Sequence, residues 1–98
     1  MMKSTEEILE ALRIFKFEVA PKYGITTLGL FGSVAREQQR EGSDVDVFFD
    51  GETPTLQTIA RMEMDLERRI GAPVQMTMLH DKLPKNFLSN IRKDAIYV

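Results

Sequence analysis

The residues most able to do chemistry lie in one stretch, residues 32–47, which reads GSVAREQQREGSDVDV. Asp44 and Asp46 stand two positions apart, so on a β-strand both carboxylates project to the same face. Carboxylate oxygens are hard ligands that suit Mg²⁺, an ion that also contacts nucleotide phosphates. Gly32 allows close approach of the backbone, and Ser33 offers a hydroxyl and can cap a short helix whose free N–H groups attract phosphate. The stretch therefore predicts a combined metal and phosphate site.

Each half of this pattern also has an ordinary structural interpretation. A Gly-Ser pair alone is usually a turn or a helix cap, and an Asp-x-Asp alone is usually a solvated strand face. Here, however, strand alternation places apolar residues opposite the two aspartates, namely Val45, Val47 and Phe49. The Gly-Ser turn ends the neighbouring predicted strand, so both halves can meet at one edge of a sheet. The combination favours the functional interpretation.

Capping signals, apolar periodicity and glycine or proline breaks predict the elements that position these residues. Ser4 and Glu7 form a capping-box pattern before apolar residues at helical spacing. In chain order, we expect a helix from about Thr5 that ends between Pro21 and Gly24, a strand at 25–31, a short helix at 33–38, a strand at 44–50, a helix at 56–70, a strand at 74–79, a helix opened by Pro84 and a short strand at 95–98. Helices and strands therefore alternate along the chain.

Length and composition limit the other possibilities. With 98 residues, the chain has room for one domain, residues 1–98, because typical domains hold about 100–150 residues. The formal charge of −2 gives no general attraction for a nucleic-acid backbone or an anionic membrane, and no apolar run is long enough for a membrane helix. The absence of cysteine excludes disulfides, thiolate metal sites and thiol nucleophiles. We expect a cytoplasmic protein without membrane or direct nucleic-acid partners.

The stretch resembles the signature of the minimal nucleotidyltransferases of the DNA polymerase β superfamily, in which a Gly-Ser pair precedes an Asp-x-Asp by ten residues. Here Gly32-Ser33 is followed after ten residues by Asp44-Val45-Asp46, within the phrases LFGSVAR and SDVDVFF. The resemblance implies an α+β fold with an α/β-like element order, in which a mixed, palm-like β-sheet carries flanking helices. It also implies transfer of a nucleoside monophosphate from a nucleoside triphosphate to a hydroxyl by two-metal Mg²⁺ chemistry.

The resemblance also implies roles for individual residues. Gly32 and Ser33 would hold the triphosphate, whereas Asp44 and Asp46 would be catalytic and would bind the metal ions. Small members of this family are commonly paired with a HEPN-domain ribonuclease toxin, which they neutralise by adenylylating a tyrosine. The implied substrate is therefore ATP, the implied partner is a HEPN toxin, and the implied function is that of an antitoxin. Oligomeric state, homo- or hetero-oligomeric, stays open.

The third carboxylate of the family is missing. Other members place it on the next strand, in a phrase like Val-Asp-Leu-Val, whereas this chain has Val74-Gln75-Met76-Thr77. The Gln75 carbonyl oxygen can ligate a metal, but it carries no negative charge and cannot act as a general base near neutral pH. The alternative function is therefore a catalytically weak or inactive module that binds nucleotide or partner and acts by contact. An aminoglycoside-modifying enzyme is less supported, because no extra domain exists to hold the sugar.

Several other charged residues keep two interpretations each. Arg36 either pairs with a phosphate or forms a helix-surface ion pair with Glu37, Glu41 or solvent. His80, the single histidine, either assists phosphate binding or proton transfer or is a solvated loop residue. The C-terminal segment is locally basic, which suits an acidic partner or a solvated helix face equally well; its cations are Lys82, Lys85, Arg92 and Lys93.

Three further carboxylates, Asp50, Glu52 and Asp81, are weighed as replacements for the missing one. Asp50 has the strand parity of the predicted metal ligands, but it lies four residues beyond Asp46, roughly 13 Å along an extended strand. Asp81 follows the third predicted strand and reaches the site only if the chain curls back. We therefore expect Asp50 and Asp81 to be loop carboxylates.

Overall fold

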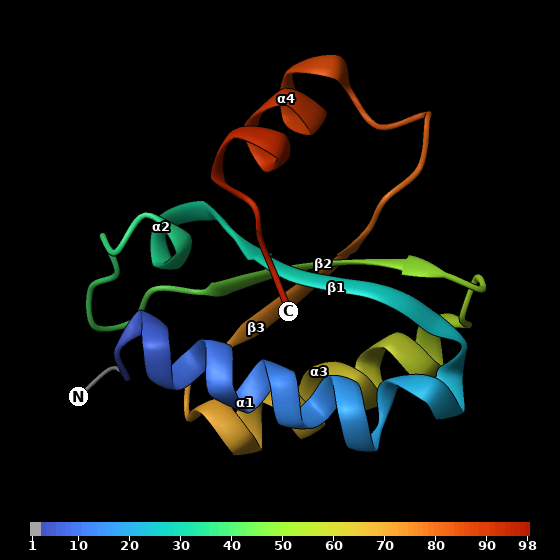
Figure 1. Cartoon of the computed structure of the whole chain (residues 1–98), viewed down its shortest axis with the longest axis horizontal. Helices are drawn as coiled ribbons and strands as arrows, with labels where there is room; N and C mark the ends of the chain where they lie inside the picture. The colour runs from blue at the N-terminus through green and yellow to red at the C-terminus, as the bar shows by residue number, and fades with distance from the viewer. Residues whose placement is uncertain (1–2) are drawn as a thin grey trace.

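The computed structural model describes residues 3–98 (Figure 1). Its elements are α1 (Thr5–Glu18), the 3₁₀ turn η1 (Ala20–Tyr23), β1 (Ile25–Phe31), α2 (Gly32–Ala35), β2 (Val45–Gly51), α3 (Leu56–Ile70), β3 (Val74–Met78), α4 (Lys85–Asp94) and β4 (Ile96–Tyr97). None of the helices formed by these residues combines the length and apolar character that a membrane span requires. Apart from η1, which was not predicted, the element order is the one that the sequence predicts.

The strands form a mixed sheet in the order β3-β2-β1-β4. β1 pairs antiparallel with β2 and with β4, whereas β2 and β3 are parallel and are joined by the crossover helix α3. The register places Asp46 of β2 between Phe31 of β1 and Gln75 of β3. The expected α+β fold, with a mixed sheet and flanking helices, is confirmed.

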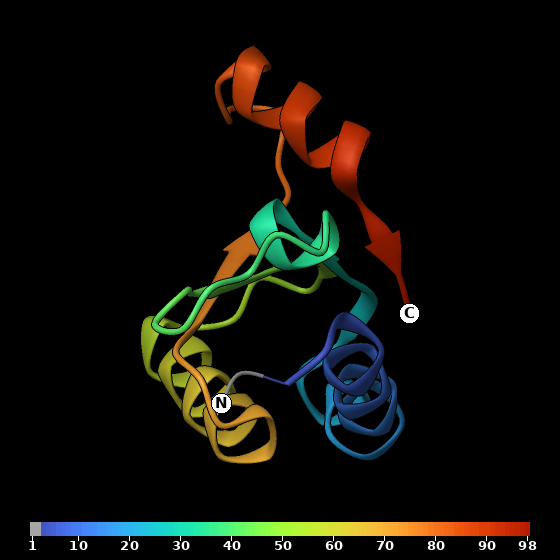
Figure 2. The ribbon, with the colours of Figure 1, turned by 90° about the vertical axis from the view of Figure 1, so that its left-hand side faces the viewer.

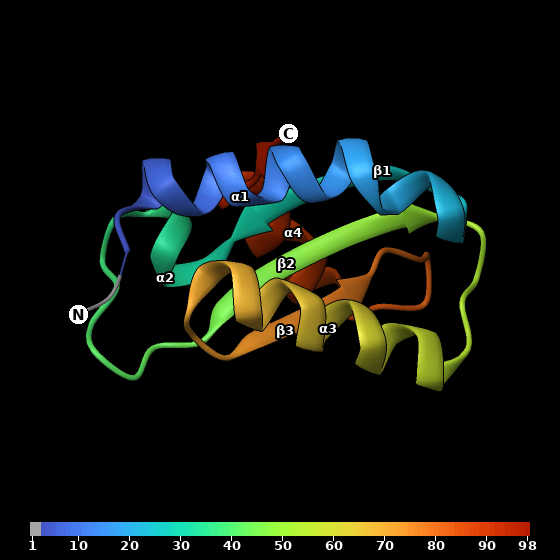
Figure 3. The ribbon, with the colours of Figure 1, turned by 90° about the horizontal axis from the view of Figure 1, so that it is seen from below.

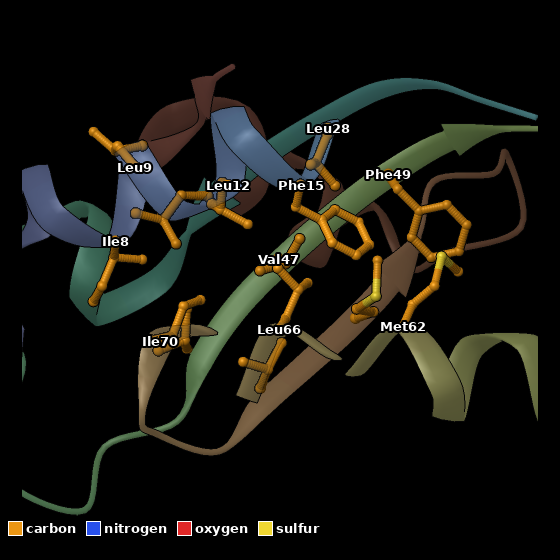
Figure 4. Packing of buried hydrophobic residues seen from close by; sticks show 14 of the residues in the cluster. Ile8, Leu9, Leu12, Phe15, Leu28, Val47, Phe49, Met62, Leu66 and Ile70 are labelled. Atoms are coloured by element: carbon orange, nitrogen blue, oxygen red, sulfur yellow. The ribbon is translucent and has the colours of Figure 1, made fainter. Parts of the chain in front are cut away.

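Helices α1 and α3 cover one face of the sheet, as the view from below shows (Figure 3). The main hydrophobic core fills the space between these helices and the sheet (Figure 4). Its fully buried side chains include Ile8, Leu12, Phe15, Leu28, Val47, Phe49 and Leu66. Because side chains alternate along a strand, β2 directs Val45, Val47 and Phe49 into this core and Asp46 toward the opposite face.

Local capping explains where α1 begins and why it ends earlier than predicted. The Ser4 hydroxyl accepts the Glu7 N–H at 3.2 Å, and the Glu7 carboxylate accepts the Ser4 N–H at 3.0 Å, which completes the predicted capping box. Hydrogen bonding of the Glu7 carboxylate to the Ser4 backbone N–H, and to the Ser4 side chain, lowers the pKa of Glu7. The α-helix ends at Glu18 because Pro21 has no N–H to continue the ladder, so the prediction that it reaches Pro21 or beyond is wrong.

The second face of the sheet is covered by α4, which stands over it on the side away from α1 and α3 (Figure 2). A small apolar cluster of Phe31, Phe48 and Ile91 joins α4 to the sheet. The Phe31 ring lies 6.2 Å from the Phe48 ring and 5.9 Å from the Phe87 ring, between centroids. Ile91 is the one buried residue of α4, so this helix is attached through a narrow contact.

Candidate active site

The site is organised around the junction of β1 and α2, where Gly32 lies directly against Asp46. Gly32 has a φ of +78°, a left-handed conformation that side chains with a Cβ rarely adopt. A Cβ at this position would lie 3.2 Å from Cγ of Asp46 and would collide with Oδ2 of the same carboxylate. Only glycine therefore lets the β1–α2 turn pass over the carboxylate of the neighbouring strand.

One aspartate of the predicted metal site, Asp46, lies at this turn, and the other, Asp44, acts on its ionisation. Asp44 is exposed and immediately precedes β2, and Asp46 is half-buried within β2. Burial raises the pKa of Asp46, the nearby charge of Asp44 raises it further, and the Arg36 guanidinium partly opposes both effects. The charges of Asp44 and Arg36 therefore both influence the ionisation of Asp46, and metal binding by the two aspartates stays a prediction.

Ser33 lies inside α2 rather than at its cap. The N-cap is Phe31, which makes no side-chain capping bond, because the helix already begins at Gly32. The prediction that Ser33 caps the helix is therefore wrong, although the residue remains half-buried next to Gly32. The helix is also shorter than the predicted 33–38, since it ends at Ala35 and Glu37 turns to a φ of +57°.

Arg36 makes an ion pair that neither sequence interpretation contained. Its Nη1 donates to Oδ2 of Asp94 in α4 at 2.6 Å, and its Nε donates to Oε1 of Gln38 at 3.1 Å. The expected partners Glu37 and Glu41 are not used, because α2 ends before Arg36 and no helical surface continues toward them. The Asp94 side chain is only 13% exposed in this pair, which links the residue that follows α2 to α4.

Gln75 lies beside Asp46, at the position where the family resemblance implies a third carboxylate. The two residues are direct partners in the parallel pairing of β2 with β3, and Gln75 is exposed on the site face. Across residues 3–98, no three His, Cys, Asp or Glu side chains cluster in a way that would hold a metal ion. Asp50 and Asp81 do not fill the gap, because together with His80 they line a different cavity of about 280 Å³. Asp50 lies within β2, so the prediction that it is a loop carboxylate is wrong.

A second cavity, of about 430 Å³, lies between α2 and α4 and adjoins the aspartates through Gly32. Its lining combines the predicted site with residues of the last helix; it consists of Phe31, Gly32, Arg36, Phe87, Asn90, Lys93 and Asp94. Sequence reasoning missed the contribution of α4. The available signal was the basic C-terminal segment, which by itself did not distinguish a site from a solvated helix face.

A buried hydrogen bond anchors the site to the main core. The Thr5 hydroxyl donates to the carbonyl oxygen of Val34 at 2.7 Å, and Thr5 is 5% exposed. Val34 itself is fully buried in the core under α1. The first turn of α1 therefore holds α2, and with it the Gly32 turn, in place.

Comparison with known proteins identifies the family. The family model described as polymerase beta, nucleotidyltransferase matches residues 17–98, so the chain belongs to this family. It is 32% identical over 98 residues to the protein adenylyltransferase MntA of Thermococcus cleftensis, across 99% of this chain and 98% of the relative. The resemblance carried by residues 32–47 is confirmed.

Solved structures agree with this assignment. A structure described as a minimal nucleotidyltransferase matches with a TM-score of 0.76 and 29% identity, over 96% of this chain and 95% of that one. A tri-AMPylated Shewanella oneidensis HEPN toxin in complex with an MNT antitoxin matches with a TM-score of 0.65 and 14% identity, over 93% and 70%. A toxin–antitoxin structure with AMP-PNP matches with a TM-score of 0.70 and 15% identity, over 97% and 72%. The last two likenesses establish a shared fold.

Proposed function

We propose that this chain is a cytoplasmic protein adenylyltransferase that transfers AMP from ATP to a tyrosine hydroxyl of a HEPN toxin, and thereby acts as its antitoxin. The observation that carries the proposal is the contact between the Gly32 turn and the Asp46 carboxylate, with Asp44 beside it. Family membership supports nucleotidyl transfer, and the name of the Thermococcus relative supports AMP and a protein acceptor. The toxin complexes of similar fold support the class of partner.

The donor set fits a divalent cation. Asp44 and Asp46 offer hard carboxylate oxygens, and their mutual repulsion, which helps to raise the pKa of Asp46, is what a cation would relieve. These two residues would hold Mg²⁺, which would supply neutralisation of the phosphate charge. Gln75 adds a neutral oxygen beside Asp46 in place of a third carboxylate.

The chain's own residues bind and orient the nucleotide. Gly32 lets a phosphate approach the backbone closely, and the Ser33 hydroxyl and the free N–H groups of Arg36 donate hydrogen bonds to it. In the transfer, the acceptor oxygen bonds to the α-phosphorus while the bond to the bridging oxygen breaks, and pyrophosphate leaves with that electron pair. The acceptor proton passes to solvent, because the Gln75 amide cannot take it.

The test is the intact mass of the HEPN partner after incubation with this protein, Mg²⁺ and each nucleoside triphosphate in turn. We expect a mass increase of one or more AMP groups with ATP, and its loss in the Asp44→Asn/Asp46→Asn variant. Asp50→Asn is the matched control, because Asp50 shares the strand and its parity but lies at the other cavity. A double variant that still transfers AMP would refute the assignment of the site.

A second candidate function rests on Gln75 alone. A chain without the third carboxylate, and without another three-ligand cluster in residues 3–98, can neutralise its partner by contact and leave no covalent mark. This candidate predicts that the two proteins form a stable complex while the partner mass stays unchanged with every nucleotide. Detection of an AMP adduct with the native chain would exclude it.

A further inference from the structure

The cavity between α2 and α4 is placed to receive part of the nucleotide. Gly32 lines the cavity on one side and contacts the Asp46 carboxylate on the other. A ligand group inside the cavity is therefore adjacent to the proposed metal ligands. Its volume of about 430 Å³ falls within the range of small-molecule sites, about 300–1,000 Å³.

The charges that line this cavity favour an anion. Two cations, Arg36 and Lys93, face one carboxylate, Asp94. Asp94 is already neutralised by Arg36 at 2.6 Å, and within residues 3–98 Lys93 forms no ion pair. The ammonium of Lys93 is thus the uncompensated charge of the cavity, and it lies on a helix that carries none of the family motif.

We propose that Lys93 of α4 binds the phosphate tail of the nucleoside triphosphate in this cavity. The inference rests on the proposed nucleotidyltransferase function and extends its site from the Gly-Ser turn to the last helix. Lys93 acts as a compact positive charge, whereas Arg36, which has five N–H donors, keeps donors for phosphate beyond those used by Asp94 and Gln38. A bound tail would then connect α2 to α4 and strengthen the narrow attachment of that helix.

Nucleotide affinity is the direct test. Lys93→Gln is compared with Lys85→Gln, which removes the same charge from an exposed position of the same helix, about 12 Å away along its axis. Calorimetric titration with ATP, ADP and AMP in the presence of Mg²⁺ should show that Lys93→Gln weakens ATP binding about tenfold. The loss should be smaller for ADP and below about twofold for AMP, because the affected contact is to the tail. Lys85→Gln should bind all three like the native chain.

An equal loss for ATP and AMP would overturn the proposal, because it would place the nucleoside rather than the tail near Lys93. Equal losses in the two lysine variants, or no loss in either, would overturn it as well. Thermal melting of each variant shows whether it is folded. Should Lys93→Gln fail to fold, Lys93→Arg, which keeps the charge, must retain ATP binding, and loss of binding in a folded Lys93→Arg would contradict a role as a simple cation.

Hydrogen exchange gives a readout that is independent of catalysis. ATP should slow amide exchange in α4, residues Lys85–Asp94, in the native chain and in Lys85→Gln, but not in Lys93→Gln. Unchanged exchange in the ATP-bound native chain would contradict the proposal. Different results would refute the proposed function itself. It is refuted if the native chain does not bind ATP, or if ATP binding is unchanged in Asp44→Asn/Asp46→Asn. If binding depends on those aspartates but not on Lys93, only the present inference is lost.

Discussion

Gly32 lies so close to Asp46 that no side chain fits between the β1–α2 turn and the carboxylate. A Cβ at Gly32 would stand 3.2 Å from Cγ of Asp46, and the backbone there has a φ of +78°. The glycine of the motif and the aspartate fourteen positions later therefore form one structural unit. This unit sets the geometry in which a phosphate and a cation can share the site.

Gly32→Ala should damage the site more than its backbone strain alone explains. The added methyl group must displace the Asp46 carboxylate, and the positive φ adds strain of about 1 kcal/mol. Gly42→Ala is the matched control, because Gly42 has a φ of +86° and its Cβ would meet nothing within 4 Å. Both variants should lose stability from backbone strain in thermal melts, and Gly32→Ala should lose more because of its clash with Asp46; only Gly32→Ala should lose ATP binding. Equal ATP affinity in the two variants would argue against the coupling of Gly32 to Asp46.

Asp46→Asn should make the metal-free protein more stable while it removes transfer. The pKa of Asp46 is higher in the folded chain than in the unfolded chain, so the ionised carboxylate opposes folding at neutral pH. Asparagine removes this charge, so the melting temperature should rise at pH 7 without metal. The difference from the native chain should shrink as the pH falls through the raised pKa, because the native side chain then becomes neutral too. Asp50→Asn, which removes a charge from an exposed position of the same strand, is the control for the loss of a charge in itself.

Gln75→Asp should increase AMP transfer if the missing carboxylate limits the native reaction. The new carboxylate would sit on β3 directly beside Asp46, where it can bind a metal ion and accept a proton. A general base typically contributes a factor of about 100 or more, so an increase in the transfer rate of about tenfold to a hundredfold is expected. Gln75→Asn, which changes length but not charge, is the control for side-chain size. A rate that Gln75→Asp leaves unchanged would show that the native site works without a third carboxylate.

Asp94→Asn should loosen α4 without unfolding the sheet. The Asp94 carboxylate is largely buried against Arg36 at 2.6 Å, and the apolar contacts that hold this helix are few, chiefly those of Ile91 and of the Phe87 ring against Phe31. Loss of the pair should lower the free energy of local opening by about 1 kcal/mol, so α4 amides should exchange about fivefold faster. Glu10→Gln removes a far more exposed ion pair, with Arg13 at 3.3 Å, and should leave exchange in α1 nearly unchanged. Exchange in α4 that does not respond to Asp94→Asn would mean that its apolar contacts suffice.

Local patterns in the sequence predicted most of the elements and the part of the site that lies in residues 32–47. The capping box at Ser4 and Glu7 set the start of α1, and glycine and proline breaks separated the strands from the helices. Strand parity predicted that Asp46 faces away from Val45 and Val47, and the structure confirms this alternation. Parity is local, because it depends only on the two-residue period of an extended backbone.

Contacts between distant segments were not predictable in this way. The partner of Arg36 is Asp94, fifty-eight positions away, rather than either nearby glutamate. Such a pair depends on how α4 crosses the sheet, and its single buried side chain, Ile91, is too weak a signal to specify that crossing from sequence. Ser33 failed as a cap for a related reason: the turn at Gly32 already starts the helix, because the strand pairing of Phe31 with Asp46 fixes where β1 must end.

The sequence alone thus determined the order of elements, the family motif and the absence of a third carboxylate, because each depends on residue type and short spacing. Only the tertiary structure decided that Gln75 lies beside Asp46, that Gly32 contacts that carboxylate, and that α4 brings Lys93 to the same site. The physical reason is that strand order, register and helix docking arise from the burial of apolar surface contributed by the whole chain, so no single segment encodes them.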